Sequence, residues 1–140
     1  MTAGYSGTPL ARKLGIKEGH SVAALWAPDH FPELLEPLPG RVRLRSDLRG
    51  GAPHDVLVAF VTSEKELRDR FARARSKLHT DGGLWIAWPK QSSPLATDLR
   101  ESHVRAHGLA EGLVDNKICA IDQDWSGLRF VVRLVDRPKR

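Results

Sequence analysis

The sequence contains one cysteine, Cys119, one methionine and one tyrosine among 140 residues. A single cysteine excludes an internal disulfide framework and any zinc or iron–sulfur site built from several cysteines. No apolar run reaches the roughly 18 residues that a membrane-spanning helix needs. The first 15 residues also lack the apolar stretch of a secretory signal. We therefore expect a soluble cytoplasmic protein that does not bind membranes.

Hydrophobic residues make up 41% of the chain and charged residues 28%, which is close to the average of soluble domains and argues against disordered or fibrous classes. A length of 140 residues suits one hydrophobic core. We expect a single domain over residues 1–140, with mobile ends at about residues 1–6 and 136–140.

The basic excess is modest and unevenly spread. The net charge is +5, but three of these charges lie in the last four residues, so the remainder carries +2. Arg41, Arg43 and Arg45 alternate along an expected strand, which is typical of a solvated edge strand. Residues 68–77 form a second basic cluster with acidic neighbours, which favours a helix surface with local ion pairs. Weak nucleic-acid binding through the arginine strand and the basic tail is a further alternative.

Apolar strand patterns alternate with helical patterns along the chain. Ser63 followed by Glu66 has the spacing of a capping box, and an apolar stripe then runs from Leu67 to Leu78. We expect strands at 21–26, 41–45, 55–61, 84–88, 113–121 and 128–135, and helices at 10–14, 32–36, 63–78 and about 97–107, the last one ended by Gly108. The alternation predicts a three-layer α/β, Rossmann-like fold with a mostly parallel sheet and a C-terminal antiparallel hairpin.

Several motifs resemble known families. LGIKEGHSV at residues 14–22 resembles the approach to the first strand of a class I S-adenosylmethionine-dependent methyltransferase, and LHTDGGLWI at 78–86 resembles the loop into the fifth strand of that family. Three further motifs are similar to those of a short bacterial family of unknown function: GYSGTPL at 4–10, AWPK at 87–90, and CAID at 119–122 with WSGL at 125–128. The first resemblance implies a methyltransferase-like fold, and the second implies no established activity.

The sequence departs from the methyltransferase pattern after the first strand. Those enzymes have a glycine-rich turn there, because backbone amides must approach the cofactor closely. Here the corresponding positions hold Trp26, Pro28 and His30. This departure implies that the cofactor site is lost or altered, and we expect no cofactor. Without the glycines, Asp47 is better interpreted as a loop residue than as a partner for a ribose hydroxyl.

Ligands of such sheets bind beyond the carboxyl ends of the parallel strands. Ser63 begins a helix whose free N–H groups could hold an anion, and Lys90 could add a positive charge. The alternative is that Ser63 only caps the helix, Lys90 is solvated and the tryptophans fill space. The candidate ligand-binding residues at this edge are Trp26, Asp29, Thr62, Ser63, Trp88, Lys90, Asp122 and Trp125.

These residues support competing functions. The first hypothesis is a non-catalytic methyltransferase-like module that binds a small anionic ligand or a protein partner at this edge. The alternative is an enzyme with a relocated acid–base pocket around Asp29, Lys90 and Asp122. No metal site is expected, because His103 and His107 share a helix face without a third ligand. Cys119 lies within a strand, where a buried thiol is inert.

Overall fold

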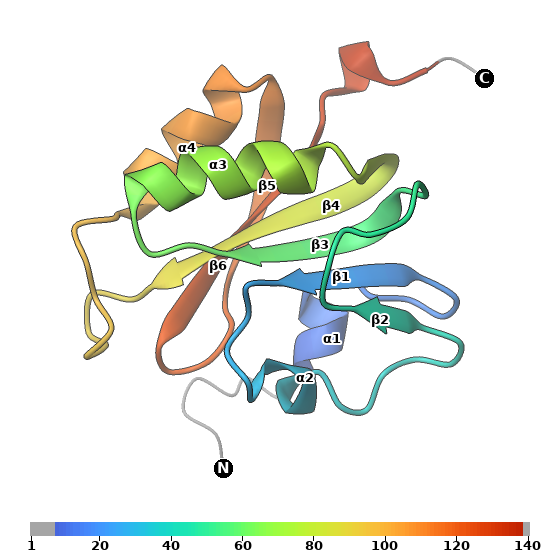
Figure 1. Cartoon of the computed structure of the whole chain (residues 1–140), viewed down its shortest axis with the longest axis horizontal. Helices are drawn as coiled ribbons and strands as arrows, with labels where there is room; N and C mark the ends of the chain where they lie inside the picture. The colour runs from blue at the N-terminus through green and yellow to red at the C-terminus, as the bar shows by residue number, and fades with distance from the viewer. Residues whose placement is uncertain (1–7, 139–140) are drawn as a thin grey trace.

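A computed structural model describes residues 8–138 of the chain. Six strands form one sheet in the order β2-β1-β3-β4-β6-β5 (Figure 1). The first four strands of this order are parallel, and β6 runs antiparallel to both β4 and β5. The strands are β1 (Ser21–Leu25), β2 (Arg43–Arg45), β3 (His54–Phe60), β4 (Leu78–Pro89), β5 (Leu113–Ala120) and β6 (Trp125–Val132).

Helices cover both faces of the sheet, so the molecule has three layers (Figure 1). The helices α3 (Glu64–Arg75) and α4 (Glu101–Ala110) lie on one face. The short helices α1 (Leu10–Lys13) and α2 (Phe31–Leu34) lie on the other face. The short 3-10 helix η1 (Leu134–Asp136) follows β6. The predicted three-layer, Rossmann-like sheet with an antiparallel C-terminal hairpin is confirmed.

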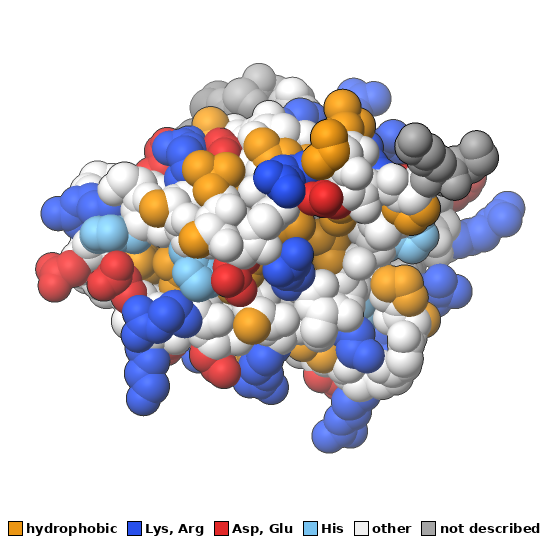
Figure 2. Space-filling model, turned by 90° about the horizontal axis from the view of Figure 1, so that it is seen from above, with side chains coloured by type: hydrophobic (Ala, Val, Ile, Leu, Met, Phe, Trp, Pro, Cys, Tyr) orange, Lys and Arg blue, Asp and Glu red, His pale blue; other side chains and the backbone are white. Residues whose placement is uncertain are grey.

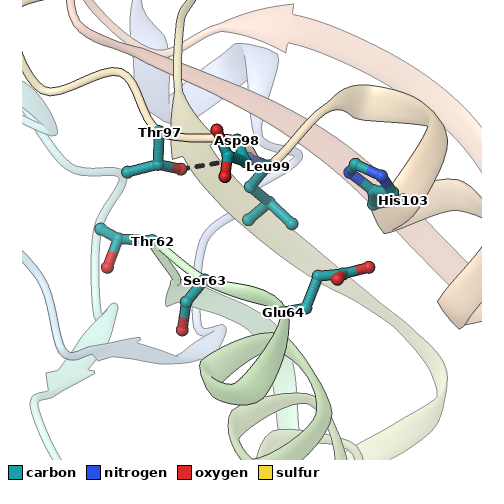
Figure 3. A pocket seen from close by; sticks show the side chains of 7 residues that line it. All are labelled: Thr62, Ser63, Glu64, Thr97, Asp98, Leu99 and His103. Carbon is teal, nitrogen blue, oxygen red and sulfur yellow. Dashed lines mark hydrogen bonds between the residues drawn. The ribbon is translucent and has the colours of Figure 1, made fainter.

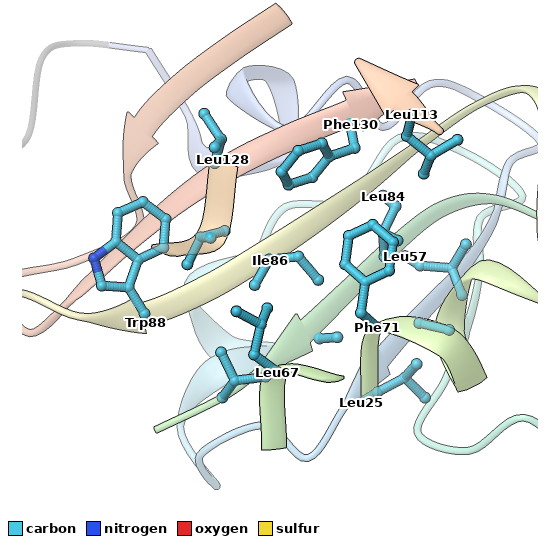
Figure 4. Close-up of a cluster of buried hydrophobic side chains, with 14 of the residues drawn as sticks. Leu25, Leu57, Leu67, Phe71, Leu84, Ile86, Trp88, Leu113, Leu128 and Phe130 are labelled. Carbon is cyan, nitrogen blue, oxygen red and sulfur yellow. The ribbon is translucent and has the colours of Figure 1, made fainter. Parts of the chain in front are cut away.

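The central strand β3 separates two apolar clusters. Its side chains alternate between the faces, with Leu57 and Ala59 in the cluster under α3 and α4, and Val56, Val58 and Phe60 in the cluster under α1 and α2. Figure 4 shows the first cluster, in which Phe71 of α3 packs over the sheet. Because both faces of β3 are buried, its sequence is apolar at nearly every position, as expected for an inner parallel strand.

The α3 surface and part of the edge strand follow the sequence. The expected strand 41–45 is shorter in the structure, because Arg41 lies in a turn with a φ of +59° and β2 begins at Arg43. Arg43 and Arg45 are exposed on β2, the edge strand next to β1, while Leu44 between them is partly buried. On α3, Arg70 pairs with Glu66 at 3.3 Å and Arg73 with Asp69 at 3.7 Å. Figure 2 shows basic and acidic side chains side by side over the face of the molecule that carries α3 and α4. These pairs confirm the prediction of a helix surface with local ion pairs.

Two glycine predictions were wrong. Gly82 and Gly83 lie inside β4, where the β3–β4 register is irregular, and a side-chain carbon at Gly82 would come 2.6 Å from the Asp55 carbonyl oxygen. Gly108 lies inside α4, and the helix ends before Gly112, whose φ is +89°. A side-chain carbon at Gly108 would come 2.5 Å from Phe130 Cδ1. Close packing, rather than a turn, requires glycine at positions 82 and 108.

The C-terminal segment also differs from the prediction. β6 begins at Trp125, within the segment expected to be a loop, because residues 125–127 pair with residues 119–120 of β5 and 87–89 of β4. It ends at Val132, and the expected strand to Val135 is replaced by η1. Asp136, expected in a mobile end, pairs with Arg133 at 2.9 Å. The expected mobile residues 1–6 and the last two residues lie outside the described part of the chain.

Boundary differences occur at all four helices. α3 ends at Arg75, and Leu78, expected as the end of its apolar stripe, begins β4. α4 begins at Glu101, after the expected start near residue 97. Pro9 is the N-cap of α1. The second helix begins at Phe31, one residue before the expected start. Between residues 8 and 138, the structure contains no helix of the length and apolarity needed to cross a bilayer.

Candidate functional site

The predicted site residues follow strand ends at one edge of the sheet. Trp26 follows β1, Thr62 and Ser63 follow β3, and Lys90 follows β4. The turn that contains Asp122 joins β5 to β6 at this same edge, because β5 runs in the direction of β4. The structure places four of these residues in two separate hollows and the two tryptophans Trp88 and Trp125 in the apolar core. Lys90 and Asp122 line neither hollow.

The first hollow lies beyond the ends of β1 and β2 and has a volume of about 590 Å³. It contains Trp26 and Asp29 of the predicted set, together with Arg45 and Ser46. The remaining lining residues are apolar, namely Ala24, Ala27, Pro28, Pro32 and Leu44. We call this space the β1–β2 hollow. Sequence reasoning missed Arg45 as a site residue, because it assigned the arginines of this strand to a solvated edge.

Trp26 has an unusual backbone and a fixed side chain. Its φ is +56°, in the left-handed region that favours glycine. The guanidinium carbons of Arg70 and Arg73 lie 5.0 and 5.1 Å from the centre of the indole, which is the geometry of cation–π contacts. The indole is thus held beneath α3, next to the α3-side core.

The second hollow, of about 240 Å³, lies at the start of α3 and is lined by Thr62, Ser63, Glu64, Thr97, Asp98, Leu99 and His103 (Figure 3). Ser63 Oγ accepts the amide hydrogen bond of Glu66 at 3.1 Å, so Ser63 is the helix cap. The Glu66 carboxylate in turn accepts hydrogen bonds from the Thr62 amide at 2.8 Å and the Thr62 hydroxyl at 2.9 Å. Burial opposes ionisation of Glu66, but these bonds and the charge of Arg70 lower its pKa.

This arrangement is a poor anion site. The Glu66 amide is already bonded to Ser63, and both donors of Thr62 are bonded to Glu66. The carboxylates of Glu64 and Asp98 line the hollow. These carboxylates would repel an anionic ligand in the hollow. Lys90, which was expected to add a positive charge beside Ser63, is not among the residues that line this hollow.

The remaining predicted residues have structural contacts. Trp88 is 5% exposed within the α3-side core, and Trp125 is 7% exposed on the opposite face, where it packs edge-on against Phe60 at 5.0 Å. The Lys90 amide donates to the Asp124 carbonyl at 2.8 Å. The two tryptophans therefore fill space in the core, which was the alternative to a role in ligand binding.

Asp122 belongs to a pair that sequence reasoning did not identify. Its Oδ1 accepts the amides of Asp124 at 2.8 Å and Trp125 at 2.9 Å, which closes the turn before β6. Its Oδ2 lies 3.1 Å from Nε2 of His30, a side chain that is 52% exposed. The pair joins residues 92 positions apart, so no local spacing could have revealed it.

Other candidate residues also have structural roles. Asp47 Oδ1 accepts the Arg49 amide at 3.0 Å, and this bond lowers the pKa of Asp47, as in a loop aspartate. The Arg100 amide donates to His103 Nδ1 at 3.0 Å, and His107 packs edge-on against Phe71. Burial raises the pKa of the Cys119 thiol, which keeps it in the unreactive form. Among residues 8–138, no three potential metal ligands gather.

Comparison with solved structures supports the fold assignment. The chain is similar to fibrillarin of Aeropyrum pernix, solved with bound S-adenosyl-L-methionine, with 15% identity over 91% of this chain and 70% of that chain and a TM-score of 0.60. It is similar to a TehB-like SAM-dependent methyltransferase of Corynebacterium glutamicum, with 11% identity over 94% and 91% of the two chains and a TM-score of 0.56. At these identities the likeness shows a methyltransferase-like fold.

A third similar structure is the magnesium protoporphyrin IX methyltransferase of Synechocystis, solved with bound SAH, with 8% identity, coverage of 89% and 80%, and a TM-score of 0.58. No curated protein matches the sequence. A family model described as "Protein of unknown function (DUF3052)" matches residues 11–134. The chain therefore belongs to this family of proteins of unknown function.

Proposed function

We propose that this protein is a non-catalytic binding module with a methyltransferase-like fold, and that it binds a small anionic ligand in the β1–β2 hollow. The observation that carries the proposal is the Trp26 indole, which is held under Arg70 and Arg73 at the turn after β1. The alternative occupant of the same edge is a protein partner. If the edge binds a protein instead, the small-ligand tests below will be negative.

The turn after β1 does not fit an adenosyl cofactor bound in the usual way. A glycine-rich turn offers bare backbone and free N–H groups, whereas here Trp26 occupies the left-handed position. Pro28 has no N–H to offer, and its carbonyl accepts the Phe31 amide at 3.0 Å. The side chain of His30 contacts Asp122. These internal contacts support the loss of the cofactor site.

The β1–β2 hollow has the chemistry of a different ligand site. Its apolar wall suits a flat hydrophobic group, and its two charged lining residues are the cation Arg45 and the carboxylate Asp29. Arg45 pairs with Asp47 at 3.5 Å, and both side chains are 48% exposed. Such an exposed pair contributes only about 0–1 kcal/mol, so a ligand carboxylate or phosphate can replace Asp47 as the partner of Arg45. A small ligand with an apolar body and one anionic group fits best.

Calorimetric titration tests the loss of the cofactor. We expect no heat of binding from S-adenosylmethionine or from its demethylated product S-adenosylhomocysteine. Micromolar binding of either compound would overturn the proposal. A Trp26→Gly variant provides a comparison, because it removes the indole from the turn.

Amide NMR with an aromatic carboxylate, indole-3-acetate, tests the ligand class. We expect millimolar or tighter binding that shifts the Trp26 indole N–H signal. The Arg45→Gln variant should bind the ligand about tenfold more weakly, a loss of about 1.4 kcal/mol in binding free energy. Arg43→Gln is the matched control, since Arg43 lies on the same strand but does not line the hollow. Equal weakening by both variants would contradict the assignment.

A second candidate function is acid–base catalysis at this edge, the alternative first placed at Asp29, Lys90 and Asp122. The half-exposed imidazole of His30, oriented by the buried Asp122 carboxylate at 3.1 Å, favours it, because general bases are often arranged in this way. A panel of nitrophenyl esters and phosphates tests it. Turnover that is lost in His30→Gln but kept in His103→Gln, a change on α4 away from this pair, would support this candidate over the first.

A further inference from the structure

A third hollow, which is polar, lies at the opposite edge of the sheet. Its volume is about 360 Å³, and it includes Asp55 near the start of β3 and His79 near the start of β4. Lys13 and Gly15 bring the end of α1 to the same space, on the face away from α3 and α4 (Figure 1). We call this space the amino-edge hollow. The length of the strands separates it from the β1–β2 hollow.

Four cationic side chains from separate elements line the amino-edge hollow. Lys13 comes from α1, Lys17 from the segment before β1, Lys117 from β5 and Arg129 from β6. The Lys13 ammonium donates to the carbonyl of Ala120, the last residue of β5, at 3.2 Å, so this side chain runs along the sheet toward the other edge. Grouping like charges raises the free energy of the folded protein unless an anion offsets them.

Arg129 is fixed in this hollow by the packing of the sheet. It lies opposite Trp85 in the β4–β6 ladder, and a side-chain carbon at Gly83 would come 2.7 Å from its Cζ. Glycine at position 83 thus leaves room for the guanidinium across β4. Nη1 of Arg129 donates to Asn116 Oδ1 at 3.3 Å. Burial and the charge of Arg137 lower the pKa of Arg129, so a bound anion would stabilise its charged form.

Two histidines add hydrogen-bond donors. Nδ1 of His20 accepts the Lys17 amide at 3.1 Å, and Nδ1 of His79 accepts the Asp81 amide at 3.1 Å. An imidazole whose Nδ1 accepts a hydrogen bond carries its hydrogen on Nε2. Both rings, which line the hollow, are therefore hydrogen-bond donors through Nε2.

Carboxylates are fewer than cations in this space. Asp55 and Asp81 also line the hollow. Asp55 Oδ2 accepts the Ser21 amide at 2.9 Å, a bond that holds the start of β1. Even without the ammonium of Lys13, which is bonded to Ala120, the cations Lys17, Lys117 and Arg129 outnumber the two carboxylates, so the hollow has an excess of positive charge.

We propose that the amino-edge hollow binds a small ligand with two or more negative charges of the phosphate type, such as a pyrophosphate group or a phosphorylated metabolite. Lys17, Lys117 and Arg129 supply the charge, and the imidazole N–H groups supply directed hydrogen bonds to phosphate oxygens. A volume of about 360 Å³ suits a small molecule. This site is additional to the β1–β2 hollow.

Titration of the whole protein with inorganic pyrophosphate tests this site, by calorimetry and by amide NMR. We expect binding that perturbs Gly15 and Gly83 while the Trp26 indole signal stays unchanged. A Lys17→Gln/Lys117→Gln double variant should bind about tenfold more weakly, which is about 1.4 kcal/mol. Both lysines are exposed, so the fold should be kept, as far-UV circular dichroism would verify.

The control variant is Lys65→Gln, which removes an exposed lysine from α3 on the other face of the sheet. It should bind pyrophosphate as the wild type does. Absence of binding at millimolar pyrophosphate, or equal weakening in the control and the double variant, would overturn the proposal. Binding of a single-stranded oligonucleotide without binding of pyrophosphate would also overturn it. None of these outcomes depends on the β1–β2 hollow, which indole-3-acetate tests separately.

Discussion

Trp26 adopts a left-handed backbone conformation that is unfavourable for a residue with a side chain. Its φ of +56° costs about 1–2 kcal/mol for a residue with a side-chain carbon. The contacts of the indole with Arg70 and Arg73 offset this cost. Truncation of the side chain separates the two contributions, because alanine and glycine both remove the ring but only glycine removes the strain.

We therefore predict that Trp26→Gly is more stable than Trp26→Ala by about 1 kcal/mol, although both are less stable than the wild type. The free energies of unfolding from urea titrations would measure the difference. In regular structure the order is reversed, with alanine more stable than glycine. A more stable alanine variant would therefore contradict the left-handed geometry of this turn.

His54 predicts a pH dependence of stability. It is 4% exposed, and its Nδ1 lies 2.7 Å from the Ser21 hydroxyl. Burial, with the charge of Arg45, lowers its pKa. Below the unfolded value of about 6.5, the unfolded chain therefore binds more protons at this residue, and stability at this site falls as the pH decreases.

We expect the unfolding free energy to decrease between about pH 7 and pH 5, and His54→Asn to reduce this slope. Asparagine can keep a hydrogen bond to the Ser21 hydroxyl without titrating. Urea unfolding of both proteins over this pH range is the measurement. An identical slope in the variant would show that His54 does not contribute.

At the scale of elements, α3 depends on its N-terminal cap. Ser63→Ala removes the acceptor of the Glu66 amide and should destabilise the protein by about 1 kcal/mol. Ser63→Thr keeps an acceptor and should recover most of this loss. Thermal or urea unfolding measures both variants, and an alanine variant as stable as the wild type would contradict the capping role.

The contact between α4 and the sheet depends on Gly108. Alanine usually stabilises a helix relative to glycine, by about 1 kcal/mol. Here its side-chain carbon would overlap the buried Phe130 ring, so we predict that Gly108→Ala destabilises by about 1–3 kcal/mol. In a Phe130→Leu background, the same substitution should cost less, because leucine lacks the ring. Equal costs in the two backgrounds, from urea unfolding, would argue against this overlap.

For the whole molecule, charge is distributed rather than gathered on one face. Arg43 and Arg45 lie on the β2 edge, the α3 arginines pair with acidic residues, and the amino-edge hollow lies at the start of the strands. Such a distribution does not match an extended phosphate backbone. We expect any oligonucleotide mobility shift at low salt to be lost at about 150 mM NaCl. A shift that persists at this salt concentration would favour the nucleic-acid alternative.

The sequence was most informative where local patterns have a direct structural meaning. The doubly apolar run of β3, the Ser63 cap and the stripe of α3 predicted elements that the structure contains. The motifs of an uncharacterised family and of the methyltransferase fold likewise agree with the comparisons. Side-chain periodicity and capping involve residues only two to four positions apart, so the sequence records them directly.

The site depended on contacts between distant residues. Periodicity could not show that Gly108 faces Phe130, that Asp122 meets His30, or that Arg129 crosses Gly83. Nor could it show that Trp88 and Trp125 belong to opposite faces of the core instead of one crevice. Local spacing thus indicated the strands and most of the helices, and the resemblance of motifs indicated the family. Packing of the sheet decided which charged and aromatic side chains share a hollow. Burial and strand register are properties of the assembled layers, and they arise only when separate segments meet.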